Sequence, residues 1–594
     1  MKAIGIFFSL QKNYRGECMS GLSNKEVAGI LKEIAVLMEL NGENIYKIRA
    51  YQNAARNLTS LQEELALLIE EDRLEEVKGI GKGIASTIKE IHAKGFSPLL
   101  EELKSNTPEG LLELIKIPGL GPATAHLLHR ELGINNPADL KKALVEGRVG
   151  KIKGFGPKRE ERLLAGLQDY ERYIQVQLLY DALLKAEEIK GYLEKFRELK
   201  RVETTGRLRR AEELVQEIDL LAVTDSASGL RDFFLQLPFV EEVRDEGERK
   251  ISIVTEDSFQ VNLFVANDEE YPIALNHYTG SREHVSRLAR LAADSGYRLT
   301  ETGLFKEGER IVLQDEADLY AILGLPYIIP ELREGQGELE AAADGRLPES
   351  VALSDIKGDL HLHSHYSDGA HSIRELVEEA RRRGYQYIAI TDHSRSLKVA
   401  GGLSIEALLR QIEEIEALQE EYDDIRIFKG IEVDIDAEGN LDYPDEILAR
   451  LDLVIASIHT GFNQSKEEIT RRIIRAMENP HVNIIGHPTG RQLKRREAYP
   501  VDLDELIRAA GATGTWLELN SSPYRLDLDA LNCRKAKEKG VKVVINTDAH
   551  YLEQFNYMLL GVLTARRGWL ESPDVINTLE LEELSRLLRA KSSK

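Results

Sequence analysis

The spacing of apolar residues changes twice along the chain and divides it into three regions. From about residue 22 to 174, apolar positions recur every three to four residues, which predicts a wholly helical region. From about 176 to 330, short runs such as EIDLLAV and FQVNLFVA stand among helical stretches and predict a mixed α+β region. After about residue 355, apolar strands alternate with amphipathic helices such as SIRELVEEARRRGY, for which Ser372 is the expected N-cap. That alternation predicts parallel strands and a barrel.

One short turn recurs three times in the helical region. The copies are VKGIGKGIAST (77–87), IPGLGPATAHLL (117–128) and IKGFGPKREERLL (152–164). A single Gly-x-Gly is weak, because any tight turn between helices uses glycine where φ must be positive. Three copies with apolar residues at matching offsets form a repeat. They resemble the helix-hairpin-helix motif, whose turn amides and helix N-terminus bind a backbone phosphate without reading bases.

The resemblance implies DNA binding by the glycines of these turns, which are Gly79, Gly81, Gly119, Gly121, Gly154 and Gly156. Lys82, Lys158 and Arg159 stand beside the turns, where they could add cationic contacts to phosphate. Solitary charges of this kind are more often solvated surface.

Length and charge limit the class of protein. At 594 residues, the chain predicts roughly three or four domains of ~150 residues each. The glycine- and acid-rich stretch ELREGQGELEAAADGRLPES (331–350) is expected to be a linker. With 78 basic and 101 acidic side chains the net charge is −23, so nucleic-acid binding must rest on local basic patches or bound metal.

Cysteine content and the first residues bear on location. Cys18 and Cys533 are too few for a disulfide framework, which favours a reducing cytoplasm. No apolar run approaches the ~20 residues of a membrane span, so no membrane partner is expected. The opening MKAIGIFFSL lacks a following small-residue cleavage site, which argues against a signal peptide. Met19, followed by Ser23 as a helix N-cap, favours residues 1–20 as a dispensable extension.

The most informative pattern in the chain is GDLHLHSHYSDG (358–369). His361 and His363 alternate with apolar residues and so leave one face of a strand end, and Asp368 follows in a turn. Two histidines alone would be a structural pair about half the time. The ends of later strands add further ligands: His393, Glu432, His459, His487, Asp548 and His550. Nine nitrogen and oxygen ligands at the carboxyl ends of successive barrel strands predict a metal-dependent active site.

These residues resemble the PHP (polymerase and histidinol phosphatase) domain, a distorted (β/α)7 barrel that hydrolyses phosphoesters. The resemblance implies up to three divalent ions, held by three sets of ligands: His361, His363, Glu432 and Asp548; Glu432, His459 and His487; Asp368, His393 and His550. Adjacent ions lower the pKa of water and stabilise phosphate oxygens. Imidazole with carboxylate suits Mn, Zn or Fe and does not choose among them. Arg491, in HPTGR, is a candidate phosphate ligand, and a surface salt bridge is an equally good interpretation.

The middle region resembles the family X DNA polymerases. GRLRRAEELVQEID (206–219) aligns without gaps to their signature G-S-x-R-R-G-x-E-x-x-G-D-x-D. NIYKIRAYQNAARNL (44–58), HYTGS (277–281) and EADLYAILGLPYIIPELREG (316–335) resemble the amino-terminal domain, the sugar-side motif and the close of the thumb. With a PHP domain behind them, these segments match the bacterial family X architecture.

The resemblance implies a multidomain α+β protein with seven segments: an N-terminal extension (1–21), an amino-terminal helical domain with the first hairpin (22–95), a fingers-like helical domain with two hairpins (96–175), a nucleotidyltransferase palm (176–270), a thumb (271–330), a linker (331–355) and the PHP domain (356–594).

The palm departs from the family pattern at its catalytic acids. Family X enzymes use three aspartates to hold two Mg ions, and this chain has Glu217, Asp219 and Asn262 instead. Asn262 has no charge and accepts no proton from the primer 3′-hydroxyl, and losing a general base costs ~10²–10⁴ in rate. Glu217 is one methylene too long for near-ideal Mg geometry.

The nucleotide-binding motif of the palm is also altered. Gly206 and Arg210 are kept as nucleotide-binding positions, but the motif serine is Arg207 and both later glycines are replaced, by Ala211 and Gln216. Arg207 fills space meant for triphosphate oxygens, although its charge could also attract them. The palm is therefore interpreted as a remnant that binds Mg or Mn weakly if at all, and dNTP binding stays open.

Four functions are compared. The first is a DNA repair enzyme whose PHP domain acts as a 3′-5′ exonuclease, with abasic-site endonuclease or 3′-phosphatase action as further options. The alternative is a bifunctional gap-filling polymerase and exonuclease. A DNA-end-binding scaffold has no evident use for nine ligands, and a small-molecule phosphatase has no need of three hairpins and a palm. The expected partner is gapped or 3′-ended duplex DNA, bound by a monomer. A lyase role for Lys47 is conceivable, but an exposed helical lysine requires no such role.

Overall fold

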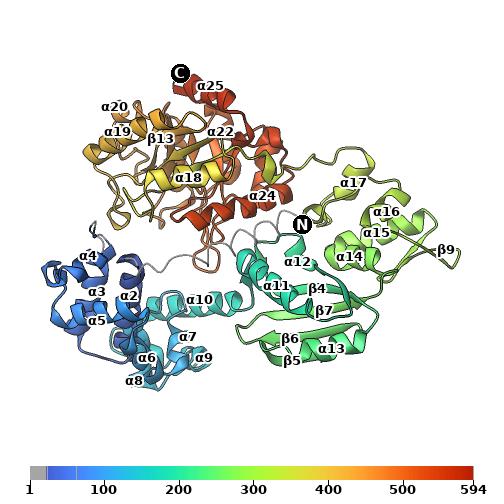
Figure 1. Cartoon of the computed structure of the whole chain (residues 1–594), viewed down its shortest axis with the longest axis horizontal. Coiled ribbons are helices and arrows are strands. Elements are labelled where there is room, and N and C mark those ends of the chain that lie inside the picture. Colours follow the sequence, from blue (N-terminus) through green and yellow to red (C-terminus); the bar gives the residue numbers. More distant parts are fainter. Residues whose placement is uncertain (1–21, 23, 60, 62, 64, 593–594) are drawn as a thin grey trace. The chain divides into compact units, whose positions relative to one another are not determined.

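The computed structural model describes residues 22 and 24–592, apart from residues 60, 62 and 64 (Figure 1). The expectations for residues 1–20, for Met19 as a start and for Cys18 and Ser23 fall outside the described residues. Two compact units divide the chain, one up to Gln175 and one from Val176 onward. Each is therefore described by itself.

The first unit is helical, as its apolar spacing predicts. Its helices are α2 (Asn24–Leu40), α3 (Ile45–Thr59), α4 (Leu65–Glu70), α5 (Lys82–Lys94), α6 (Pro98–Asn106), α7 (Glu109–Leu114), α8 (Pro122–Leu132), α9 (Pro137–Val145) and α10 (Pro157–Tyr173). One apolar core contains side chains from α2 through α10, including Leu31, Ile88 and Leu128.

The three Gly-x-Gly turns share one geometry. In each, the first glycine has a positive φ of 82° to 94°, which a Cβ would disfavour, and the second glycine is the N-cap of the next helix. The middle residue is buried in the core, and its amide donates to the carbonyl three residues earlier at 3.0 Å; these residues are Ile80, Leu120 and Phe155. The apolar middle residue explains why the repeat keeps its matching offsets.

The second unit begins with a palm built on a five-stranded sheet. Its order is β2 (Leu199–Thr204), β4 (Glu217–Thr224), β7 (Gln260–Ala266), β6 (Lys250–Thr255) and β5 (Val240–Glu246). β4 and β7 are parallel, with Asp219 paired to Asn262 in the register, and the other pairs are antiparallel. A small ladder of β1 (Gln177–Leu178) and β3 (Leu214–Val215) lies beside α11 (Leu179–Leu193).

The thumb packs around its own apolar core. Its main elements are α14 (Tyr271–Thr279), α15 (Arg282–Asp294), the ribbon of β8 (Arg298–Leu299), β9 (Leu304–Lys306) and β10 (Glu309–Ile311), and α16 (Glu316–Ile322).

The stretch expected to be a linker differs from that expectation, because it contains α17 (Glu338–Ala343). Leu339 and Ala342 pack into the thumb core, and the buried Glu338 carboxylate accepts a bond from His284 Nδ1 at 2.7 Å. Apolar residues in LEAAA thus outweigh the glycine and acid content of the surrounding sequence.

The predicted barrel is present as seven parallel strands in sequence order: β11 (Gly358–Leu362), β12 (Tyr387–Ile390), β13 (Arg426–Asp434), β14 (Leu453–Ser457), β15 (Ile484–Ile485), β16 (Trp516–Asn520) and β17 (Val543–Asn546). A parallel bridge between Leu362 and Ala549 brings the first strand to the last, so the barrel is nearly closed. Ser372 caps α18 (Ile373–Arg382), as expected, by accepting the amide of Glu375. No helix among the described residues has the length and apolar content needed to cross a bilayer.

Candidate metal centre

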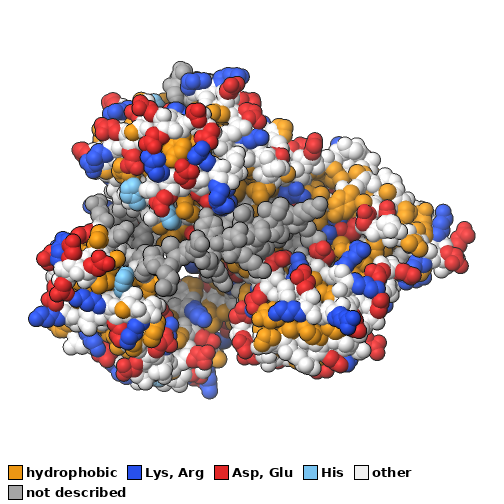
Figure 2. Space-filling view, viewed as in Figure 1, with side chains coloured by type: hydrophobic (Ala, Val, Ile, Leu, Met, Phe, Trp, Pro, Cys, Tyr) orange, Lys and Arg blue, Asp and Glu red, His pale blue; other side chains and the backbone are white. Residues whose placement is uncertain are grey.

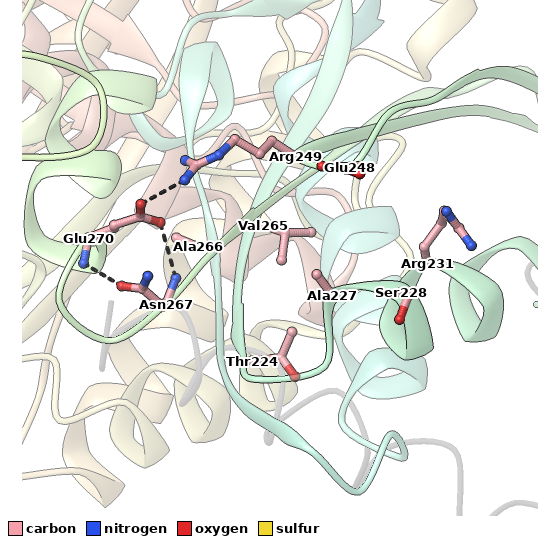
Figure 3. A pocket seen from close by; sticks show the side chains of 10 residues that line it. All are labelled: Thr224, Ala227, Ser228, Arg231, Glu248, Arg249, Val265, Ala266, Asn267 and Glu270. Carbon is pink, nitrogen blue, oxygen red and sulfur yellow. Dashed lines mark hydrogen bonds and ion pairs between the residues drawn. The ribbon is translucent and has the colours of Figure 1, made fainter.

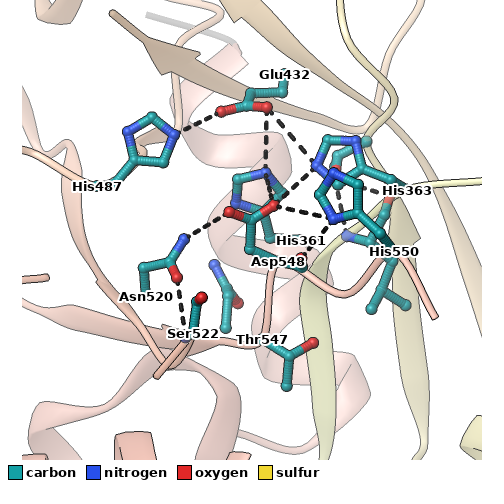
Figure 4. A network of polar contacts seen from close by, with 12 residues as sticks. His361, His363, Glu432, His487, Asn520, Ser522, Thr547, Asp548 and His550 are labelled. Atoms are coloured by element: carbon teal, nitrogen blue, oxygen red, sulfur yellow. Dashed lines mark hydrogen bonds and ion pairs between the residues drawn. The ribbon is translucent and has the colours of Figure 1, made fainter. Parts of the chain in front are cut away.

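The nine predicted ligands converge at the carboxyl end of the barrel strands. His361 lies on β11, Glu432 lies on β13, and the others follow the ends of their strands. Figure 4 shows His361, His363, Glu432, Asp548 and His550 facing one another, with His487 beyond Glu432. The parallel arrangement explains this, because the carboxyl ends of parallel strands meet at one end of a barrel.

Three carboxylates connect the histidines. Glu432 is central: its oxygens lie 2.8 Å from His393 Nδ1, 3.0 Å from His487 Nε2, 3.3 Å from His459 Nε2 and 3.5 Å from His361 Nε2. Asp548 Oδ1 lies 3.0 Å from His363 Nε2 and 3.7 Å from His361 Nε2. Asp368 Oδ1 lies 3.3 Å from His550 Nε2 and 3.7 Å from His393 Nε2.

Three groups of these atoms are compact enough to hold one ion each, with all donor atoms within 4.8 Å. They are His361, His363 and Asp548; His393, Glu432 and His459; and His363, Asp368, His393 and His550. The structure thus places His393 beside Glu432 as well as beside Asp368, so it is shared between two groups. His487 contacts Glu432 but belongs to none of the three groups.

Several buried nitrogen and oxygen atoms that could bind a metal have no hydrogen-bond partner of good geometry among the described residues. They are His361 Nε2, both ring nitrogens of His363, His393 Nδ1, Glu432 Oε2 and His487 Nδ1. An unsatisfied buried polar atom costs about 1–3 kcal/mol, and native proteins keep few of them. Imidazole and carboxylate donors at one point are what divalent metals bind. The donor set therefore fits divalent cations.

Crowding of acids and imidazoles shifts the pKa of each group. Burial opposes the charged imidazoles of His459 and His550, but neighbouring carboxylates outweigh it and raise the pKa of both to about 9. Burial likewise opposes ionisation of Glu432, yet the surrounding histidines hold its pKa well below its usual range. Burial and the nearby Arg525 guanidinium lower the pKa of His487 to about 4. Without metal, protons at His459 and His550 balance the buried carboxylates.

Two buried acids that sequence reasoning missed orient the ligands. Glu518 on β16 accepts His361 Nδ1 at 2.7 Å through one oxygen and the His487 amide at 2.7 Å through the other. Asp434, at the end of β13, accepts His459 Nδ1 at 2.9 Å. With Nδ1–H donated to these acids, the Nε2 atoms of His361 and His459 face Glu432 and are the atoms left to bind a metal. The sequence signals were weak: Glu518 is the one acid of a mostly apolar strand, and Asp434 lies two residues after the predicted ligand Glu432.

Two arginines beside the centre have different surroundings. Arg525, which sequence reasoning missed, lies with Nε 3.6 Å from Asp548 Oδ2 and keeps part of its side chain exposed. Arg491, predicted as a phosphate ligand, donates Nε to the Arg525 carbonyl at 2.9 Å and Nη2 to the Leu526 carbonyl and, at 2.7 Å, to Glu213. These protein acceptors occupy the Arg491 guanidinium, so its position favours a structural role.

The palm acids form a different kind of site. Asp219 and Asn262 face each other across parallel strands, and Asn262 Nδ2 donates to Asp219 Oδ1 at 2.7 Å while its Oδ1 accepts Ser252 Oγ at 2.7 Å. The asparagine is thus fixed with its donor toward the acid. Burial raises the pKa of Asp219 to about 6, although the Asn262 bond opposes the shift. Glu217 lies two residues earlier on the same face of β4.

The nucleotide-binding positions beside these acids are also occupied. Arg210 is buried and donates Nε to Glu334 at 3.0 Å, Nη1 to the Thr279 carbonyl at 2.7 Å and Nη2 to Glu212. Gly206, with φ +59°, abuts Asp219, whose Oδ2 would lie 2.3 Å from an added Cβ. Protein groups therefore satisfy the arginine that the family pattern assigns to nucleotide.

An open pocket of about 420 Å³ on the palm lies elsewhere (Figure 3). Its lining includes Thr224, Arg231, Arg249, Ala266 and Glu270. Thr224 and Ala266 end β4 and β7, whereas the degenerate acids lie toward the starts of these strands. The pocket is therefore separate from the polymerase-like acids, and an ion pair of 2.7 Å between Arg249 and Glu270 lies at its lining.

Comparison with known proteins matches each region. Models of a helix-hairpin-helix domain match residues 22–96, a SAM-like helix-hairpin-helix tandem 111–169, a DNA polymerase beta thumb 274–334 and a PHP domain 359–522. Over 572 residues the chain is 41% identical to the DNA polymerase/3′-5′ exonuclease PolX of Bacillus subtilis strain 168, covering 96% of this chain and all of that protein. The chain belongs to the PolX family.

The barrel of this PolX-family chain also resembles smaller proteins. A probable phosphatase of Thermoanaerobacter sp. strain X514 is 38% identical over 203 residues, which are 32% of this chain and 78% of that protein. A probable phosphatase of Syntrophotalea carbinolica is 35% identical over 202 residues, covering 32% of this chain and 79% of that protein. The barrel sequence thus recurs in proteins in which the matched part makes up more than three quarters of the chain.

The surface of this PolX-family chain carries mixed charges. On the face that Figure 2 shows, acidic and basic side chains are interspersed rather than gathered by sign. Neither sign therefore forms a single large patch among the described residues on this face.

Proposed function

We propose that this protein is a DNA repair enzyme whose PHP barrel removes nucleotides from 3′ ends as a metal-dependent 3′-5′ exonuclease. One observation carries the proposal. Nine ligands converge on a cluster in which several buried ligand atoms have no hydrogen bond of good geometry among the described residues, whereas Asp219 in the palm accepts a bond from Asn262. The name of the Bacillus subtilis relative includes the same exonuclease activity.

The ligands are proposed to hold up to three divalent ions, with Mn, Zn and Fe as the candidates. The sets are those implied by the sequence, with His393 shared between two groups in the structure: His361, His363, Glu432 and Asp548; Glu432, His459 and His487; Asp368, His393 and His550. When bound, such ions supply Lewis-acid stabilisation of phosphate oxygens and lower the pKa of water.

Side chains around the metal ligands hold the ligands in place and leave the cluster accessible from one side. The Asp368 and His550 side chains are 35% and 26% exposed, whereas His361 is fully buried, so substrate is expected to enter beside Asp368 and His550. Arg525, beside Asp548, offers a cation to a phosphate oxygen. Glu518 and Asp434 fix the imidazole tautomers throughout the reaction.

The proposed partner is DNA, and gapped or 3′-ended duplex is the proposed form. Open space surrounds the second glycine of each hairpin, since an added Cβ at Gly81, Gly121 or Gly156 would meet no atom within 4 Å. A phosphate is therefore able to approach the amides at the N-termini of the following helices. The same reasoning supports abasic-site endonuclease or 3′-phosphatase action on DNA, and the smaller relatives are named probable phosphatases. A cytoplasmic monomer remains part of the proposal.

The polymerase site is proposed to be impaired. Asn262 occupies an Asp219 oxygen that a metal would need, and Arg210 is committed to Glu212 and Glu334. The second candidate is a bifunctional gap-filling polymerase and exonuclease. It is favoured by the acids kept at Glu217 and Asp219 and by the name of the relative, which includes polymerase.

One experiment separates the two candidates. Purified protein with Mn is placed on a 5′-labelled gapped duplex, with and without dNTPs, and primer length is followed. Shortening that is lost in His361→Ala, but kept in Asp219→Ala and in the surface control His481→Ala, supports the exonuclease. Lengthening that requires both dNTPs and Asp219 supports the bifunctional enzyme. No change of any 3′-ended DNA by metal-loaded protein would refute the proposed function.

A further inference from the structure

The altered nucleotide motif of the palm contacts the barrel directly. Its backbone accepts a bond from the barrel, because Arg567 Nη1, on α24 (Met558–Arg567), donates to the Arg210 carbonyl at 2.8 Å. The same nitrogen lies 3.0 Å from Glu334, the acid that holds the Arg210 side chain. A family nucleotide-binding position is thus enclosed between the thumb and a barrel helix.

A second contact joins this motif to the rim of the metal centre. Glu213 accepts Arg491 Nη2 at 2.7 Å, and both side chains are largely buried. Arg491 also donates to the carbonyls of Arg525 and Leu526, in the segment that carries the Arg525 guanidinium to Asp548. Two successive contacts therefore connect Glu213 to Arg525: Glu213 bonds to Arg491, and Arg491 bonds to the Arg525 carbonyl. Arg525 in turn lies beside the predicted metal ligand Asp548.

Further contacts extend the interface on both sides of the motif. Lys494 Nζ donates to Gln177 on β1 at 3.0 Å, and Tyr180 lies edge-on to Tyr557 with ring centroids 5.3 Å apart. Arg566 pairs with the buried Glu331 at 2.8 Å. In each ion pair the barrel supplies the cation and the palm or thumb supplies the acid: Arg491 with Glu213, Arg567 with Glu334, and Arg566 with Glu331.

We propose that residues 206–215, the altered nucleotide motif, are the docking seat of the PHP barrel, with Glu213 and the Arg210 carbonyl as positioning groups. The seat fixes the barrel against the palm, so that a 3′ end supported by the palm meets the metal centre in one orientation. In these partly buried ion pairs all the cations come from the barrel and all the acids from the palm or thumb. They favour a single orientation of the barrel, because any other orientation would leave buried charges unpaired. The part of this inference that concerns DNA cleavage rests on the proposed exonuclease function, and the part that concerns docking does not.

The test compares Glu213→Ala and Arg567→Ala with Glu241→Ala, a matched control on the exposed strand β5. Two substrates are used: the gapped duplex, which needs palm and barrel together, and thymidine 5′-(p-nitrophenyl phosphate), which needs the metal centre alone. We expect kcat/KM for duplex to fall about 10- to 100-fold in both variants, because small misplacements far from the chemistry cost this much. Hydrolysis of the small diester stays within about twofold of wild type, as does metal content.

Hydrogen exchange of the full chain tests docking without using activity. We expect Arg567→Ala to raise exchange in residues 206–215, although the substitution lies more than 350 residues away in sequence. Arg566→Glu is also expected to raise exchange in residues 206–215. The double variant Arg566→Glu with Glu331→Arg, which swaps the two charges, is expected to restore both the slow exchange and the cleavage of duplex. This pair lies away from the metal ligands and tests the interface even if Glu213→Ala fails to fold.

Two outcomes overturn the proposal. If Glu213→Ala and Arg567→Ala match Glu241→Ala in exchange and in the ratio of duplex to diester hydrolysis, the motif is no docking seat. If Glu213→Ala lowers only dNTP-dependent extension, the motif still serves nucleotide. Wild-type protein that cleaves no DNA would refute the exonuclease function, while the exchange measurements would still decide the docking.

Discussion

Replacing Glu518 by glutamine removes one negative charge from beneath the metal centre with almost no change in volume. The carboxylate is fully buried and accepts four donors: His361 Nδ1, the His487 amide, Asn546 Nδ2 at 3.0 Å and Asn520 Nδ2 at 3.3 Å. A glutamine retains one acceptor oxygen and adds a donor. Each carboxylate oxygen accepts two of the four donors, so two donors face an NH₂ group instead of oxygen in either amide orientation.

The expected magnitude follows from these contacts. Leaving a buried donor unsatisfied costs about 1–3 kcal/mol, and at about 1.4 kcal/mol per decade this corresponds to roughly 5- to 150-fold in a binding constant. Loss of an outer partner of a metal-bound histidine typically costs 10- to 100-fold in affinity or activity. We therefore expect Glu518→Gln to weaken binding of the ion at His361 by about 10- to 100-fold.

The assay is competition for Mn between the protein and a chelator of known affinity, followed by hydrolysis of the small diester at saturating metal. Glu538→Gln, an exposed substitution of the same kind on α23 (Ala530–Glu538), is the control and is expected to match wild type. Unfolding of the metal-free variant shows whether the fold survives. Affinity within twofold of wild type, with normal activity, would show that the His361 tautomer needs no acid and would refute the reasoning.

Three further predictions concern the palm, the hairpins and pH. Asn262→Asp puts a second carboxylate where an amide now donates, so the metal-free protein should lose about 1–3 kcal/mol of unfolding free energy, and added Mg should restore it in thermal melts. Gly119→Ala, at φ +82°, should cost about 1–2 kcal/mol in unfolding, whereas Gly121→Ala should spare the fold but weaken duplex binding in fluorescence titrations. Metal must displace protons from His459 and His550, whose pKa values are raised to about 9, so metal affinity measured by calorimetry should rise from pH 7 to 9. In the metal-free protein these two groups stabilise the fold below about pH 6.5, and that contribution should fade through pH 9.

The barrel centre was predictable because two simple regularities combine there. Strand alternation places His361 and His363 on one face, and parallel strands bring their carboxyl ends together. Glu518 and Asp434 lacked a comparable signal, since neither the single acid of β16 nor a second acid beside Glu432 on β13 reveals its partner. The Arg491–Glu213 pair was equally hidden, because it joins residues 278 positions apart that belong to different regions of the chain.

The hairpin repeat and the linker show where composition succeeds and fails. Glycine at positive φ leaves a signal in sequence, and the structure has positive φ at Gly79, Gly119 and Gly154. The segment 331–350 has the glycine and acid content of a linker, yet Leu339 and Ala342 pack into the thumb. The composition of a segment does not show which few apolar positions are buried. The partner of the buried Glu338, His284, is distant in sequence and was not predictable from the segment.

The metal centre of the barrel and the acids of the palm differ in how their buried polar atoms are satisfied. In the barrel, buried ligand atoms without a hydrogen bond of good geometry among the described residues, such as Glu432 Oε2, impose a cost that bound ligand must offset. In the palm, Asp219 is bonded to Asn262, and Arg210 is held by Glu212, Glu334 and the Thr279 carbonyl. Asp219 and Arg210, satisfied in this way, have no such cost to recover from Mg or nucleotide. The altered nucleotide motif also bonds to the barrel, through the Arg210 carbonyl and Glu213, and these contacts give a reason to keep the motif even if its polymerase residues are lost.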